Sequence, residues 1–261
     1  MTPPEINLAQ PDLTNPEAVL HELLDNDQRV RDEFAGALES ELAQLAEAIA
    51  SCFQRMPPIH EVAVRLRSPR IDIMCAFLLG VLDDVMVSTK LLLTGKLMPS
   101  GNVMRQAIEG VAMAILCSTE DELVIVERPR QGDLRGRYWE LVWADDRLVQ
   151  GQRAVDQLAL NAEALGINPE GIASLQAAQK FFHPFSHCGR VAIAHRAALD
   201  QPGVFNLGGH FEIAKLDGYH VHLRQQTNLC SVLAPALEHL LGTMISGVGA
   251  PASVSNPPEQ A

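Results

Sequence analysis

Two long apolar stretches near the middle of the chain set the expected architecture. Residues 71–94 are apolar on nearly every helical face, and residues 101–117 carry only two charged side chains. A helix that is apolar all round belongs in a large core or in a membrane. Asp83 and Asp84 interrupt the first stretch after about half of the roughly 20 apolar residues that a bilayer requires. We therefore expect a soluble bundle built around an antiparallel hairpin of these two helices.

Outer helices are expected on the N-terminal side of this hairpin. Asn15-Pro16-Glu17 is typical of a helix start, with Asn as the N-cap and Pro at the first helical position. Residues 28–54 then have an apolar side chain every three or four positions, which predicts one amphipathic helix on the outside of the bundle. Its apolar stripe consists of Phe34, Leu38, Leu42, Leu45, Ile49 and Phe53. Met56-Pro57-Pro58 is expected to end this helix, and residues 61–64 form a strand-like run in the connector.

The C-terminal half predicts more helices with short connections. Residues 119–129 are expected to form a short element, followed by a loop at 131–133. Helices are expected at 137–165, with a break near Gly151, and at 169–182, 184–199 and 219–245. The Gly-rich residues 202–215 indicate a loop or a small hairpin near 204–214. The fold class is therefore all-α, an up-and-down bundle of seven or eight helices.

The pattern also divides the chain into regions. Residues 1–14 are expected to be a flexible N-terminus, and 15–56 the N-terminal amphipathic helices. Residues 57–246 form the main helical-bundle domain. Residues 247–261 are rich in Gly, Pro, Ser and Ala, so a disordered tail is expected there.

Composition restricts the partners and the compartment. The net charge is −12 and the pI is near 5.1, so the surface repels phosphate backbones and no DNA partner is expected. The five cysteines are scattered and form no CxxC pair, which supports neither a zinc site nor a redox motif. The start of the chain lacks the basic and apolar segments of a signal peptide. We expect a cytoplasmic protein with no cofactor and no membrane partner.

Arg105 and Glu109 are the first candidate site residues. They lie one helical turn apart in an otherwise apolar helix. An isolated buried ion costs several kcal/mol, so these charges are either paired with each other or with Asp83 or Asp84, or used for function.

The segment FFHPFSHCG, residues 181–189, is the second candidate. His183 and His187 are four positions apart, the spacing that places two imidazoles on one face in helical metal sites. Pro184 favours His183 as a helix N-cap, and no Glu separates the two histidines. Polar groups in an apolar interior need partners that water cannot supply. We therefore predict that Glu109 lies within hydrogen-bonding reach of His183, Ser186 or His187, with Arg105 beside it.

Arg190 and His195 are separated by four residues on a late helix. This spacing resembles the Arg-x(4–6)-His motif of the HEPN superfamily, helical-bundle proteins that include RNA-cleaving toxins. The resemblance implies catalysis by Arg190 and His195 at a dimer interface, with Arg190 orienting an RNA phosphate and His195 acting as acid or base. The order of the parts from 70 to 245 also resembles uncharacterised bacterial helical proteins of the domain-of-unknown-function type, which implies a fold and no activity.

Three functional hypotheses follow from these features. The first is a non-enzymatic binding or interaction module that forms a homo-oligomer through its N-terminal or core-helix faces. The second is a HEPN-like ribonuclease or toxin using Arg190 and His195, the one hypothesis with an RNA partner. The third is a metal-binding helical bundle that uses His183 and His187.

Overall fold

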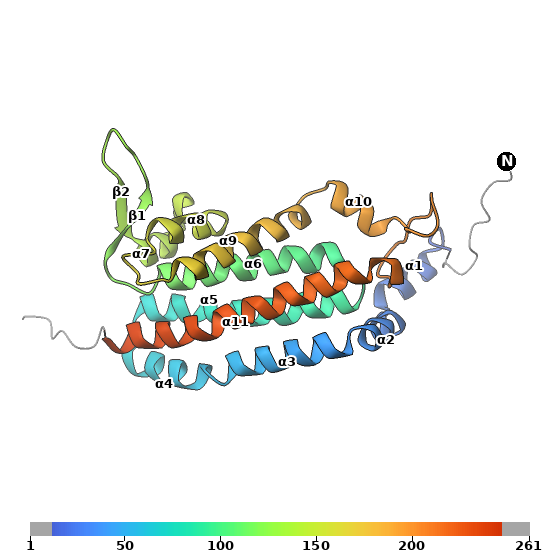
Figure 1. The fold of residues 1–261 in the computed structure, drawn as a ribbon, viewed down its shortest axis with the longest axis horizontal. Helices are drawn as coiled ribbons and strands as arrows, with labels where there is room; N and C mark the ends of the chain where they lie inside the picture. The colour runs from blue at the N-terminus through green and yellow to red at the C-terminus, as the bar shows by residue number, and fades with distance from the viewer. Residues whose placement is uncertain (1–11, 247–261) are drawn as a thin grey trace, which may run out of the picture.

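A computed structural model of the chain describes residues 12–246, and it is an all-α bundle with one small two-stranded sheet (Figure 1). The expectations of a disordered tail at 247–261 and of flexibility over residues 1–11 lie outside the described residues. The α-helices are α1 (Pro16–Leu24), α2 (Gln28–Ala37), α3 (Glu39–Phe53), α4 (Met56–Leu66), α5 (Pro69–Leu93), α6 (Leu97–Leu116), α7 (Tyr138–Trp143), α8 (Gly151–Leu160), α9 (Pro169–Phe182), α10 (Arg190–Arg196) and α11 (Leu216–Ser246). The strands are β1 (Glu122–Val126) and β2 (Leu134–Arg137), and short 3-10 helices occur at Arg147–Val149, His183–Ser186 and Ile213–Lys215.

The predicted central hairpin is confirmed as α5 and α6, which pack along their whole length (Figure 1). Seven apolar side chains of α5 and most of those of α6 are buried. The turn between them requires Gly95, which has a φ of +69°. A Cβ atom at this position would lie only 2.2 Å from the backbone nitrogen of His210. The turn of the hairpin is therefore in direct contact with the loop that precedes α11.

The longest helix, α11, runs beside α3, α4 and α6 and spans the molecule (Figure 1). By length and composition alone it is apolar enough to cross a membrane. Its buried side chains extend from Tyr219 in the first turns to Met244 near the end. They pack in the same core as α5 and α6. Pro235 lies inside this helix.

Several local predictions differ from the structure. The helix expected at 184–199 is a 3-10 helix at His183–Ser186 followed by the short α10, Arg190–Arg196. The predicted helix 28–54 is divided at Leu38, whose backbone leaves the helical region (φ −126°, ψ 25°). The strand-like residues 61–64 belong to α4, because Pro57 and Pro58 stand in its first turn and start a helix. Of the loop or small hairpin expected near 204–214, the structure has the loop, since the pairing described there is an isolated bridge between Ala197 and Phe205.

The β-hairpin of the protein instead joins β1 and β2, which pair antiparallel. The side chain of Asn161, just after α8, completes the outer edge of β1. Its Oδ1 accepts from the backbone nitrogen of Val124 at 2.8 Å, and its Nδ2 donates to the Val124 carbonyl at 2.9 Å. The amide therefore replaces a neighbouring strand and attaches the hairpin to the bundle.

Candidate functional site

Arg105 and Glu109 form an ion pair with each other. The Arg105 Nε donates to Glu109 Oε1 at 2.8 Å, and both side chains are mostly buried on α6. The other oxygen of Glu109 lies 3.2 Å from where a Cβ atom would stand on Gly151, the first residue of α8. A carboxylate near a helix N-terminus is favoured by the helix dipole. These contacts account for both charges in structural terms.

The predicted convergence of Glu109 with the histidine segment is wrong. Among the described residues, the Glu109 side chain forms a hydrogen bond with Arg105 and with no residue of the histidine segment. The 3-10 helix at 183–186 contacts α6 near Gly101, where a Cβ atom would lie 2.3 Å from the ring of Phe185. Gly101 and Glu109 are eight residues apart, about 12 Å along the helix. The large ring of Phe185 therefore anchors the segment, and its polar groups do not determine where it docks.

His183 and His187 lie close together, with ring centroids 4.6 Å apart in an edge-to-face arrangement. Both residues are exposed to solvent, while the Ser186 hydroxyl is buried without a hydrogen-bond partner. Across residues 12–246 there is no group of three or more His, Cys, Asp or Glu side chains placed to hold a metal ion. His183 and His187 could supply two metal ligands, and within residues 12–246 no third ligand is placed beside them.

Arg190 and His195 are both on α10 but in different environments. Arg190 is exposed at the first position, and His195 is buried. Burial, with smaller contributions from His210, Lys215 and Arg196, lowers the pKa of His195 to about 4. A general acid or base works best when its pKa is near the working pH. The environment of His195 therefore gives no support to the expected ribonuclease role within one chain.

His195 belongs to a polar cluster that was not expected from the sequence. Its ring stacks on that of His210, with centroids 5.3 Å apart, and Lys215 Nζ lies 3.2 Å from His210 Nε2. Lys215 also pairs with Glu212 at 2.7 Å and donates to the carbonyl oxygens of His195 and Ala197 at 2.7 and 2.8 Å. The ammonium group thus caps the C-terminus of α10, and the cluster fixes the loop between α10 and α11.

A second buried network crosses the centre of the bundle. Ser88 on α5, Ser100 on α6, and His222 and Gln226 on α11 are all at most 1% exposed. Gln226 Nε2 donates to Ser88 Oγ at 2.8 Å, and Ser100 Oγ lies 3.1 Å from His222 Nε2. Ser100 also donates to the Ser88 carbonyl at 2.8 Å, which uses its only hydroxyl hydrogen. The network joins three helices. Because its serine hydroxyls are buried, neither of them is an accessible nucleophile. The spacing of His222 and Gln226, four apart in an apolar helix, is the signal that sequence reasoning missed.

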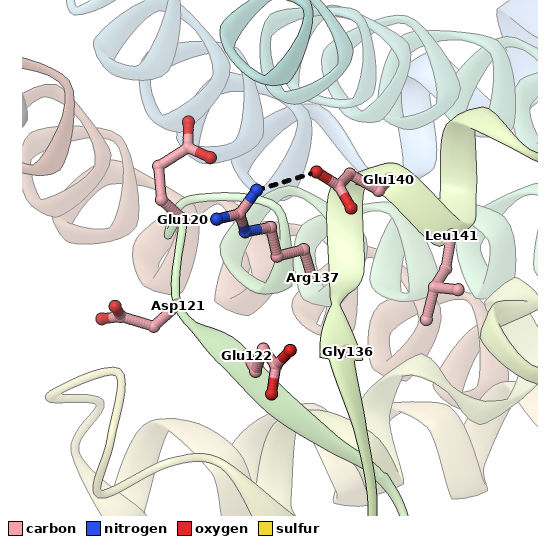
Figure 2. A pocket seen from close by; sticks show the side chains of 7 residues that line it. All are labelled: Glu120, Asp121, Glu122, Gly136, Arg137, Glu140 and Leu141. Atoms are coloured by element: carbon pink, nitrogen blue, oxygen red, sulfur yellow. Dashed lines mark hydrogen bonds and ion pairs between the residues drawn. The ribbon is translucent and has the colours of Figure 1, made fainter. Parts of the chain in front are cut away.

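An acidic groove of about 540 Å³ lies between the β-hairpin and α7 (Figure 2). Its charged side chains are Glu120, Asp121, Glu122, Arg137 and Glu140. Figure 2 shows Arg137 between Glu120 and Glu140, and its Nη1 donates to Glu140 at 3.1 Å. The adjacent carboxylates, with Glu140 first, raise the pKa of Arg137. Four carboxylates around one guanidinium leave this surface negative.

Exposed apolar side chains gather at the end of the molecule formed by α1, α10 and the loop before α11 (Figure 1). Within residues 12–246, ten of the sixteen exposed large apolar residues belong to residues 13–24 and 193–213, which we call the apolar end. They are Leu13, Leu20, Leu23, Leu24, Ile193, Leu199, Val204, Phe205, Leu207 and Ile213. The two segments are neighbours, because Glu22 Oε1 lies 3.2 Å from where a Cβ atom would stand on Gly208. A large exposed apolar patch is one of the features by which interaction surfaces are recognised, so the apolar end is a candidate for one.

Comparison of the chain with known protein families, with curated proteins and with solved structures found no match.

Proposed function

We propose that this protein is a non-catalytic helical-bundle interaction module that associates with a second copy of itself through the apolar end. The observation that supports this proposal is the exposure of that surface. Leu23 and Leu24 on α1 are 75% and 76% exposed, and α1 buries none of its residues. A helix with its leucines in water gains little from folding alone, whereas covering them removes apolar area from solvent.

The surface differs from the one expected in the sequence analysis. The N-terminal amphipathic helix 28–54 was expected to supply one oligomer face. Phe34, Leu38, Leu45 and Cys52 are instead buried in the bundle, where α3 packs against α11. The surface that remains available is contributed by α1 and by the α10 region.

Charge complementarity favours a second copy as the occupant. The segment with α1 carries the exposed acidic residues Glu17, Glu22 and Asp25, and it contains no Lys or Arg. On α10, Arg190 and Arg196 are exposed. In a two-fold symmetric dimer every contact occurs twice, so an arrangement with α1 of one protomer against α10 of the other forms this contact at two places. The apolar contacts would then be flanked by opposite charges.

Other occupants fit this surface less well. A net charge of −12 opposes binding to nucleic acid and to anionic membranes. The acidic residues of α1 would themselves face the lipid headgroups. A second copy also carries a net charge of −12, and the local pairing of α1 carboxylates with α10 arginines offsets this repulsion at the contact.

The test is the mass in solution of the full chain across a concentration series, measured by sedimentation velocity and light scattering. Wild type is expected to be a dimer, and Leu23→Glu combined with Leu24→Glu to be a monomer. A central apolar contact typically contributes about 2 kcal/mol or more, so the dimer should weaken more than tenfold. Leu79→Glu is the matched control, because Leu79 is 54% exposed on α5, away from the apolar end.

Charge reversal gives an independent result. Glu22→Arg and Arg196→Glu should each weaken the dimer, and the two together should restore part of it. A wild-type protein that remains monomeric at every concentration, or a dimer that responds equally to Leu79→Glu, would contradict the proposal.

A further inference from the structure

A pocket of about 660 Å³ is lined by residues at the start of α5 and the end of α11. These helix ends lie at the opposite end of the bundle from α1 and α10 (Figure 1). Four segments form the pocket: the start of α5, the residues after α6, the turn after α8 and the last turns of α11. We call it the Arg70 pocket. Its size is in the range of small-molecule sites, which enclose most of a ligand between apolar walls and a few polar groups.

Arg70 is the main polar group of this pocket. Its side chain is 6% exposed, and its Nε donates to Glu120 Oε1 at 2.8 Å. Its Nη1 donates to the carbonyl oxygen of Ser118. Nη2 has no hydrogen-bond partner among the described residues, and it is not one of the fully enclosed polar atoms. The nearly buried guanidinium therefore keeps one N–H donor group, Nη2, that bonds to neither Glu120 nor Ser118. A ligand carboxylate could accept a hydrogen bond from this group.

The remaining lining has a mixed character. Leu165, Ala164 and Gly242 supply an apolar wall. The His239 imidazole also lines the pocket and makes no hydrogen bond within residues 12–246. The carboxylate of Asp121 stands at the rim, where it accepts from the Thr119 hydroxyl at 3.2 Å.

The balance of charge selects the ligand class. Glu120 already compensates the charge of Arg70, and its second oxygen accepts from Trp139 Nε1 at 3.1 Å. A phosphate or a plain carboxylate would bring more negative charge next to Glu120 and Asp121. A zwitterion adds no net charge and offers an ammonium group to Asp121.

We propose that the Arg70 pocket binds a free α-amino acid with an aliphatic side chain. The ligand carboxylate accepts from Arg70 Nη2, the ammonium group donates to Asp121, and the side chain packs against Leu165 and Ala164. This inference is independent of the proposed self-association, which uses the other end of the molecule.

Isothermal titration calorimetry of the full chain with L-leucine tests the ligand class. Isocaproate, which lacks the ammonium group, and isoamylamine, which lacks the carboxylate, are the matched probes. Each should bind at least about tenfold more weakly than leucine, since each lacks one of the two charge-assisted contacts. No heat with leucine, or equal affinity for isocaproate, would overturn the proposal.

Variants locate the site without removing a structural group. Gly242 lines the pocket and has open space where a Cβ atom would stand, so Gly242→Leu should fill the pocket and abolish leucine binding. Gly218 is an equally open position at the other end of α11, so Gly218→Leu should bind as wild type does. Unchanged binding by Gly242→Leu would overturn the location.

Asp121→Asn tests the role given to the rim carboxylate. The variant should bind leucine about tenfold more weakly than wild type and should bind isocaproate at least as tightly as wild type does. Equal leucine affinity in this variant would overturn the ammonium contact. The mass of Gly242→Leu in solution is measured in parallel. This variant should form the same dimer as wild type, which would show that the loss of leucine binding does not come from the apolar end.

Discussion

Lys215 donates through its Nζ atom to the carbonyl oxygen of His195 at 2.7 Å and thereby attaches the start of α11 to the last turn of α10. The same ammonium group compensates Glu212, and both side chains are 10% exposed. One cation therefore serves a helix C-terminus and a nearly buried carboxylate. Four predictions follow from this cluster and from the other polar contacts of the bundle.

Replacing Lys215 by Met should destabilise the fold by about 3 kcal/mol, because it leaves Glu212 without its compensating charge and uncaps α10. Urea unfolding monitored by circular dichroism measures the change. Lys180→Met, at an exposed position of α9, is the control and should have little effect. Equal unfolding midpoints for the two variants would mean that the cluster contributes nothing to stability.

Acid should destabilise the protein through its buried histidines. The pKa of His195 falls from an ordinary 6.5 to about 4, mainly through burial. The unfolded chain therefore binds a proton below about pH 6.5 that the folded chain does not accept until about pH 4. The stabilising contribution is complete above pH 6.5 and decreases by about 3 kcal/mol as the pH falls to 4. His222, whose pKa burial lowers to about 3, acts in the same direction.

The measurement is the free energy of unfolding across this pH range for wild type and for His195→Gln. The variant should lose less stability between pH 6.5 and 4, because one histidine no longer has to charge in a buried site beside Lys215 and Arg196. His60→Gln, on the exposed side of α4, should follow the wild-type curve. Parallel curves for wild type and His195→Gln would refute the assignment.

Glu109→Ala should destabilise the fold by about 1 kcal/mol, the value for an ordinary hydrogen bond. A cost of roughly 3–5 kcal/mol applies to breaking a fully buried charge pair, whereas these two side chains retain 17% and 15% exposure. A double-mutant cycle with Arg105→Ala should give a coupling of about 0.5 kcal/mol, as for other pairs four residues apart on a helix. A coupling several times larger would show that the pair has a role that its geometry does not explain.

Ser100→Ala should cost about 2 kcal/mol, because the carbonyl of Ser88 and the ring of His222 lose a partner where no water can replace it. Ser174→Ala is the matched control, since the Ser174 hydroxyl donates to a carbonyl one turn back on an exposed helix face. Thermal unfolding of the two variants should separate them clearly. A Ser100 variant as stable as the control would contradict the energetic importance of the network.

The part of the fold that the sequence predicts well is the part that local pattern determines. Residues 71–117 are apolar enough that only a central hairpin suits them, and α5 and α6 confirm it. The division at Leu38 was missed because the apolar periodicity continues across it unchanged. The β-hairpin was missed because its outer edge is completed by Asn161, a residue far along the chain that no local pattern connects with Val124.

The candidate site was less predictable, because it depends on which segments meet. The spacing of Arg105 and Glu109 allowed an ion pair with each other or with Asp83 or Asp84, and in the structure they pair with each other. The position of residues 183–186 depends instead on Phe185 meeting Gly101, a contact between segments eighty-four residues apart in number. Arg70 could not be distinguished from other arginines, because its burial results from four segments closing around it.

Pro235 has a consequence for the order in which α11 comes apart. Proline has no backbone N–H, so the carbonyl of Ser231 lacks the bond that an ordinary residue at 235 would donate. The last 11 residues of α11 (236–246) form about three turns. One backbone hydrogen bond is therefore missing between these turns and the rest of the helix. Amide protons there should exchange with solvent sooner than those around His222. Since these turns carry His239 and Gly242, one wall of the Arg70 pocket would open while the middle of the bundle stays closed, giving a ligand a way in.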